Sequence, residues 1–65
     1  MDTEAAAFVL DRMDMARVAI LEAKQTIEKF AQPEDAAISK LLDEMLAKVE
    51  QVDAAIRASS YPAAR

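Results

Sequence analysis

The side chains of this 65-residue chain that could take part in chemistry are mainly carboxylates. Asp11 and Asp14 lie three residues apart, and Asp43 and Glu44 are adjacent. Such pairs of acids can share a proton or bind a divalent cation. The dimetal sites of helical bundles, however, use a Glu-x-x-His arrangement, and this chain contains no histidine. We therefore interpret the acids as solvated charges, or as charges that complement helix dipoles.

The remaining residue types exclude the common kinds of catalysis. A serine such as Ser39 or Ser59 needs an adjacent base to become a nucleophile, and no histidine is present to supply one. The lack of cysteine excludes disulfides, Cys-based zinc sites and thiol redox centres. The lack of glycine excludes the usual phosphate-binding loop. The sequence predicts a protein that is not an enzyme and that uses no cofactor or metal.

The charges disfavour nucleic acid and membranes as partners. The formal net charge is −4 and the pI is about 4.6, whereas nucleic-acid affinity comes mainly from lysine and arginine. The most hydrophobic stretch, residues 5–21, contains Asp11, Arg12, Asp14 and Arg17, which a membrane-spanning helix would not tolerate. The first residues also lack the basic start and apolar core of a signal peptide. We expect a cytoplasmic protein.

Two prolines, Pro33 and Pro62, divide the chain into long segments that are typical of helices. Both segments are rich in Ala, Leu, Met, Glu, Lys and Gln, the residues that lose least on entering a helix. We predict a single all-α domain, residues 1–65, with helix one over about 3–31, a turn at about 30–33, helix two over about 33–59 and a tail at 60–65. Because short connections join antiparallel neighbours, the expected fold is an antiparallel two-helix hairpin.

The residues at the ends of these segments support the same boundaries. Asp2 or Thr3 can cap the first helix, since the side chain of either residue can accept a hydrogen bond from a free backbone N–H group. Pro33 suits the first position of a helix, and it disfavours a helical conformation at Gln32. The sequence thus predicts a sharp break at Gln32–Pro33.

Each predicted helix carries a seam of apolar residues at three- and four-residue spacing, the pattern of a coiled coil. We expect both seams to lie in the core. Arg12 and Arg17 flank the first seam, and we expect them to pair with acids of helix two or of another chain. Glu44–Lys48 and Asp53–Arg57 pairs are expected within helix two. The helix-one seam is Ala6, Val9, Met13, Ala16, Ile20, Ala23, Ile27 and Phe30. The helix-two seam is Ile38, Leu42, Met45, Val49, Val52 and Ile56.

Helix one has more apolar side chains than a hairpin needs. Beyond its seam lie Phe8, Leu10, Met15, Val18 and Leu21, which we predict to be the partner-binding residues. Chains this small usually need disulfides, a metal or oligomerisation for stability. We therefore expect a homodimer or larger assembly, with the hairpins forming a four-helix bundle and helix one contributing more to the interface.

These expectations favour a small non-enzymatic protein–protein interaction module of adaptor, regulator or co-chaperone type. Its expected partner is a second copy of itself, with another helical protein as the alternative. Neither nucleic acid nor a membrane is expected as a partner.

The layout also resembles the Rop family of small plasmid-encoded proteins. The resemblance lies in the chain length, the short turn and the alternation of Met13, Ala16, Ile20, Ala23 and Ile27, and it spans residues 3–58. It implies a helical hairpin that dimerises into a four-helix bundle and binds RNA. No residues here match the family's RNA-contacting residues, and its central aromatic has no counterpart at the seam. A Rop-like RNA-binding modulator is thus the alternative function.

Overall fold

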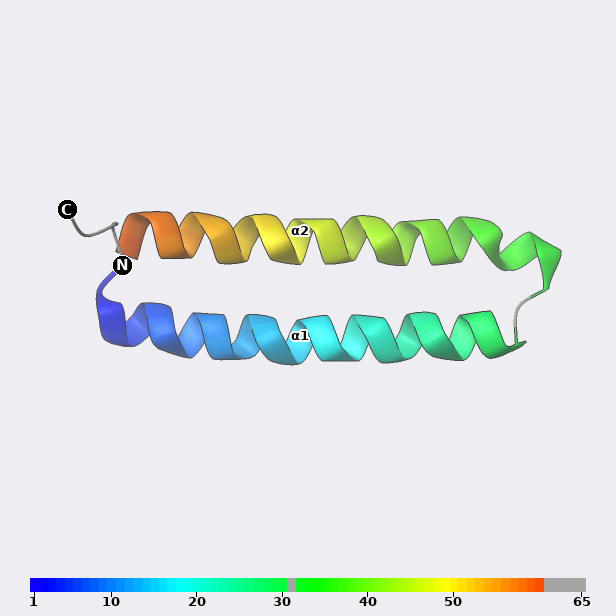
Figure 1. The fold of residues 1–65 in the computed structure, drawn as a ribbon, viewed down its shortest axis with the longest axis horizontal. Coiled ribbons are helices and arrows are strands. Elements are labelled where there is room, and N and C mark those ends of the chain that lie inside the picture. Colours follow the sequence, from blue (N-terminus) through cyan, green and yellow to red (C-terminus); the bar gives the residue numbers. More distant parts are fainter. Residues whose placement is uncertain (31, 61–65) are drawn as a thin grey trace.

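The computed structural model describes residues 1–30 and 32–60 and is a hairpin of two long antiparallel helices (Figure 1). Helix α1 spans Thr3–Phe30. A short 3-10 helix, η1, spans Pro33–Asp35 and runs directly into helix α2, Ala36–Ser60. The Cα atoms extend over 49 × 17 × 17 Å, so the molecule is a rod. The all-α hairpin predicted from the sequence is confirmed.

The second helix extends one residue beyond its predicted end. Ser60, which we placed in the tail, is the last residue of α2 and is buried. Its hydroxyl donates a hydrogen bond to the backbone carbonyl of Met1, 3.3 Å away, which docks this last turn onto the start of the chain. The predicted helical residue 31 and the predicted tail residues 61–65 lie outside the described residues.

Local capping explains where the helices begin. The Asp2 carboxylate accepts a hydrogen bond from the backbone N–H of Ala5 at 2.8 Å, so Asp2 caps α1, as one of the two predicted alternatives. At the turn, the N–H of Gln32 donates to the Asp35 carboxylate at 3.0 Å, and the N–H of Asp35 donates to the Gln32 carbonyl at 2.9 Å. These bonds satisfy backbone groups that a helix start leaves free. The predicted break at Gln32–Pro33 is confirmed, with Pro33 the first residue of η1.

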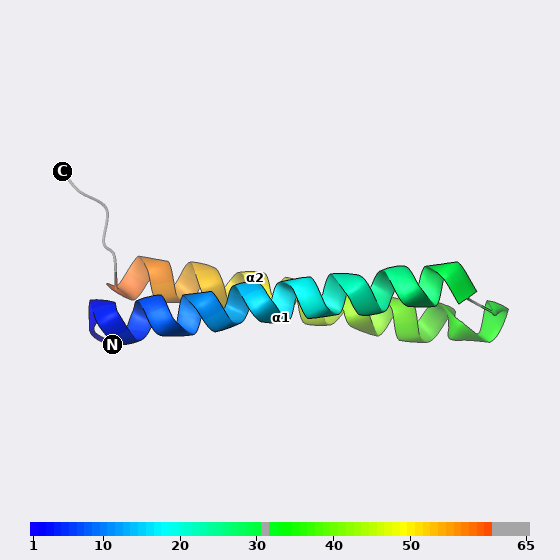
Figure 2. The ribbon, with the colours of Figure 1, turned by 90° about the horizontal axis from the view of Figure 1, so that it is seen from below.

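The helices cross at a shallow angle near their middles (Figure 2). Shallow crossing keeps residues seven apart on the same side of the contact, as in a coiled coil. The hairpin core is small: Ala6, Leu10 and Ile56 form one buried cluster, with Val9 packed against it, and Ile20 is buried nearer the middle. Among the described residues no large side chain is fully buried. The contact between α1 and α2 alone therefore leaves much apolar surface in water.

Candidate functional site

Helix α1 presents three strips, each made of residues seven apart, that differ in their relation to α2. The first strip, the inner strip, is buried or half-buried. The second, the ion-pair strip, lies on one side of the inner strip. The third, the open strip, lies on the other side and becomes exposed toward the turn. The inner strip consists of Ala6, Met13, Ile20 and Ile27. The ion-pair strip consists of Leu10, Arg17 and Lys24, and the open strip of Val9, Ala16, Ala23 and Phe30.

Helix α2 has the same three strips. Its inner strip is Leu42, Val49 and Ile56, and its ion-pair strip is Ser39, Leu46, Asp53 and Ser60; all of these are half-buried or buried. Its open strip is Ile38, Met45 and Val52, which are 48%, 51% and 43% exposed. The predicted burial of the helix-two seam is therefore wrong for one half of its residues. The predicted burial of the helix-one seam is wrong for Ala23 and Phe30, which are exposed. The hairpin uses the ion-pair strip for contact in place of the open strip.

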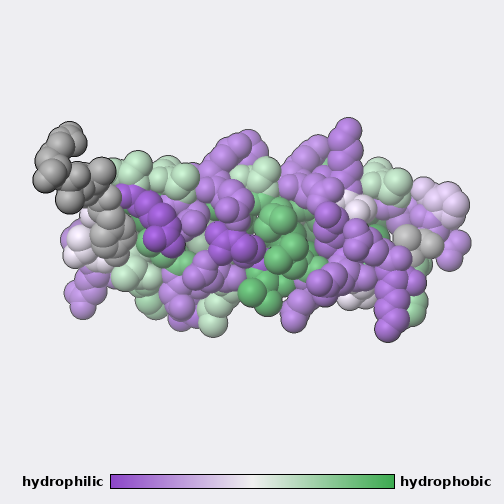
Figure 3. Space-filling view, viewed as in Figure 1, coloured by the Kyte–Doolittle hydropathy of each residue, from purple (hydrophilic) through white to green (hydrophobic). Residues whose placement is uncertain are grey.

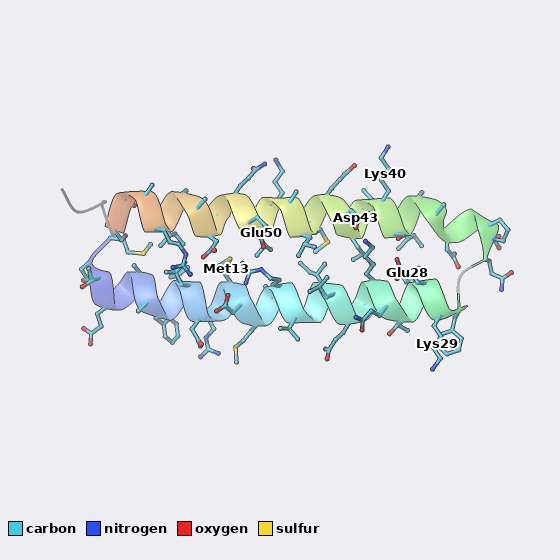
Figure 4. All side chains as sticks on the ribbon, viewed as in Figure 1. Met13, Glu28, Lys29, Lys40, Asp43 and Glu50 are labelled. Carbon is cyan, nitrogen blue, oxygen red and sulfur yellow. The ribbon has the colours of Figure 1, made fainter. Side chains whose placement is uncertain are left out.

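Ion pairs join the two ion-pair strips and fix the register of the helices. Arg17 Nε lies 2.6 Å from Glu50 Oε1, and its Nη2 lies 3.5 Å from Asp53 Oδ2. Lys24 Nζ lies 2.6 Å from Asp43 Oδ1. In Figure 4 both Asp43 and Glu50 lie between the two helices. The predicted pairing with acids of helix two is confirmed for Arg17, whereas Arg12 contacts Phe8 and Met15 of its own helix.

Further charges surround this cluster. Arg17 Nη1 also binds Asp14 within α1. Arg57 Nε lies 3.3 Å from Asp53 Oδ1, so the predicted Asp53–Arg57 pair is present. Among the described residues, no ion pair joins Glu44 to Lys48, which was the other pair expected in helix two. In the view of Figure 3, hydrophilic side chains cover most of the surface, with a hydrophobic area near the middle. We call the side that carries these inter-helix pairs the ion-pair face.

The ion pairs favour the charged forms of the bases. The hydrogen bond from Lys24 to Asp43, together with the charge of Asp43, raises the pKa of Lys24 above its ordinary value of 10.5. Hydrogen bonds to Glu50 and Asp14 likewise raise the pKa of Arg17. A base whose pKa is raised by folding stabilises the fold while it is protonated, and this contribution disappears as the pH rises through the raised pKa.

Lys24 gives an alkaline test of this linkage. Between about pH 8 and about pH 11, the wild-type Tm is expected to fall by more than that of Lys24→Gln, because only the wild type loses the Lys24–Asp43 pair. Lys40→Gln is the matched control, since Lys40 points away from α1 in Figure 4. Thermal unfolding followed by circular dichroism measures both. Equal slopes for the wild type and Lys24→Gln would contradict a role for the pair in stability.

The structure separates the predicted partner-binding residues into different surroundings. Leu10 is only 8% exposed and packs with Ala6 and Ile56, so its placement on a free surface is corrected. The physical reason is its strip: Leu10 precedes Arg17 by seven residues and faces α2 as Arg17 does. Phe8 and Met15 are exposed, as predicted.

Val18 and Leu21 are exposed, but neither belongs to an apolar strip. Leu21 lies seven residues from Asp14 and from Glu28, and Val18 lies seven residues from Asp11. Single apolar side chains among charged ones are common on protein surfaces.

Phe8 and Met15 are joined by an arginine. The Arg12 guanidinium lies 4.8 Å from the centre of the Phe8 ring, and Arg12 Nη1 lies 3.2 Å from Met15 Sδ. Arginine above an aromatic ring is a stabilising contact. The three side chains therefore form one small cluster on α1.

The open strip of α2 is an exposed apolar surface that could not be recognised from the apolar period of the sequence. The apolar period predicts that Ile38, Met45 and Val52 lie in the core, but all three are exposed. The sequence does contain a signal for this exposure. In antiparallel register, Arg17 and Lys24 match Glu50 and Asp43, so the ion-pair strip of each helix turns toward the other helix and the open strips stay outside.

Pockets, clusters of metal-ligating side chains and membrane-spanning helices were sought in the described part of the chain. No pocket is found, and no group of three or more acidic, histidine or cysteine side chains is placed to hold a metal ion. Within residues 1–30 and 32–60, neither helix combines the length and apolar character required to cross a membrane. The candidate site is the set of apolar strips, because Ile38, Met45 and Val52 stay exposed in the hairpin.

No protein-family model, curated protein or solved structure matches this chain.

Proposed function

We propose that this protein is a non-enzymatic protein–protein interaction module, of adaptor, regulator or co-chaperone type, that acts as a homo-oligomeric helical bundle. One observation carries the proposal. Ten large hydrophobic side chains are more than a third exposed in the hairpin, while no large side chain among the described residues is fully buried. Apolar surface on this scale is typical of proteins that bind another protein.

The size of the chain supports self-association in particular. Chains below about 70–80 residues rarely gain enough stability from a single core, and they use disulfides, a metal or oligomerisation instead. This chain has no cysteine, which leaves disulfides out. A closed two-fold pairing buries the same apolar patch on both copies at once.

The mass in solution tests this proposal. Light scattering at micromolar concentration is expected to give at least twice the 7.1 kDa of one chain. Because association stabilises the folded state by mass action, the Tm is also expected to rise with protein concentration. A folded 7.1 kDa monomer whose Tm is independent of concentration would contradict the proposal.

The RNA-binding alternative has less support. Arg17, Lys24 and Arg57 are already paired with acids, and the net charge is −4. We expect binding to structured RNA at physiological salt to be weaker than about 10 μM in a fluorescence anisotropy titration. Sub-micromolar binding that weakens steeply with added salt would instead favour the Rop-like function.

A further inference from the structure

The apolar seam of each helix does not point straight at the other helix but is turned to one side of the contact between them. The inner and open strips of α1 and α2 are apolar except for Ser59, which ends the open strip of α2, whereas the ion-pair strips contain Arg17, Lys24 and Asp53. Each seam is therefore centred between its inner and open strips. The ion-pair strips meet, as Arg17–Glu50 and Lys24–Asp43 show, so the open strips lie together on the opposite side. We call that side the open face.

We propose that a second copy of this chain docks on the open face, with α1 of each copy lying over α2 of the other. This inference rests on the proposed function and deepens it, since it names the surface and the arrangement. It assigns self-association to the strips of Ala16, Ala23, Met45 and Val52, in place of Val18 and Leu21.

Few charged side chains lie on or beside the open face, which favours its burial by a second copy. The flanking strip of α1 is Ala5, Arg12, Ala19 and Thr26, and that of α2 is Leu41, Lys48 and Ala55. Of these and the open strips, only Arg12 and Lys48 are charged, and both are exposed. Docking therefore removes no carboxylate from water, which would be costly. An apolar centre with charges at the rim is typical of an interface.

The area and spacing of the face suit a second copy. The rod is 49 Å long and 17 Å wide in Cα extent, so one face offers on the order of 800 Å², which is the area per partner of a standard interface. A partner must present apolar residues at seven-residue spacing along that length. A second copy does so by symmetry, since its own open face needs the same cover.

The sizes of the side chains select the arrangement. The register set by Lys24–Asp43 and Arg17–Glu50 places Ala23 near the height of Met45, and Ala16 near the height of Val52. A two-fold axis along the rod places each alanine over the large residue of the other copy, so small and large side chains fill each layer. If α1 of one copy lay over α1 of the other, alanine would face alanine, and the large side chains of the two α2 helices would crowd each other.

Two charge-introducing variants test the surface. Met45→Glu and Val18→Glu remove large apolar side chains that are 51% and 54% exposed in one hairpin. The two variants should therefore have similar effects on association unless a second copy covers the open face. Sedimentation equilibrium is expected to show self-association weakened at least about 100-fold by Met45→Glu, which buries two unpaired carboxylates per dimer. Val18→Glu is expected to change it by less than about threefold.

The outcomes distinguish this inference from the function on which it rests. Loss of association with Val18→Glu but not with Met45→Glu would overturn the open face and leave the interaction module intact. A monomeric wild type would overturn both. Circular dichroism of each variant at matched concentration reports whether the helices persist.

Cross-linking tests the arrangement without introducing a charge. The chain has no cysteine, so the single variants Ala23→Cys, Met45→Cys and Val52→Cys can be mixed in pairs and oxidised. Ala23→Cys with Met45→Cys is expected to give the mixed disulfide dimer as the main product. A main product from Met45→Cys with Val52→Cys would place α2 over α2 and overturn the arrangement.

Discussion

Replacing Ile20 by alanine is expected to lower the free energy of unfolding by about 2–4 kcal/mol per chain. Ile20 is 8% exposed and lies in the inner strip of α1, facing α2. Truncation removes buried methyl and methylene groups and leaves a cavity that the long helices can only partly close. Urea unfolding followed by circular dichroism, at one fixed protein concentration, measures the change because association makes stability concentration-dependent.

Leu21→Ala is the matched control for this variant. Leu21 is the next residue of the same helix and has the same number of side-chain carbons, but it is 38% exposed. Its truncation is expected to cost less than about 1 kcal/mol. A cost equal to that of Ile20→Ala would mean that Leu21 is covered in the assembly, and this would contradict docking through the open face.

The hairpin could be predicted from the sequence because its determinants are local. Asp2 caps the first helix, and Pro33 with Asp35 starts the second. Between these signals, good helix formers continue without glycine or internal proline. Each of these effects acts within a few residues, so the sequence alone was enough to locate the helices.

The direction in which each helix faces could not be predicted in the same way. The apolar period identifies a seam that includes Met45 and Val49, but it does not say which half of the seam meets the other helix. Contacts between residues far apart in the chain decide this, above all Arg17–Glu50 and Lys24–Asp43. They turn Met45 outward, and the same rotation buries Leu10, which the sequence placed on the free surface.

Reversing the charge of Arg17 is expected to destabilise the hairpin more than any other single charge reversal among the described residues. Arg17→Glu would place a carboxylate beside Asp14, Glu50 and Asp53, which the arginine now holds together. We expect the Tm to fall by several degrees more than in the control Lys40→Glu, which changes the net charge equally. The difference should narrow between about 0.05 M and about 1 M salt, because salt screens repulsion between exposed charges.

A charge swap separates this pairing from simple loss of the arginine side chain. In the double variant Arg17→Glu/Glu50→Arg, the new arginine can pair with the new glutamate and with Asp53, so part of the lost Tm is expected to return. No recovery would mean that the packing of Arg17, and not its charge, sets the register. Arg17 lies on the side opposite the open face, so any Arg17→Glu chains that remain folded are expected to associate. If they were instead folded monomers, the ion-pair face would be the interface between copies.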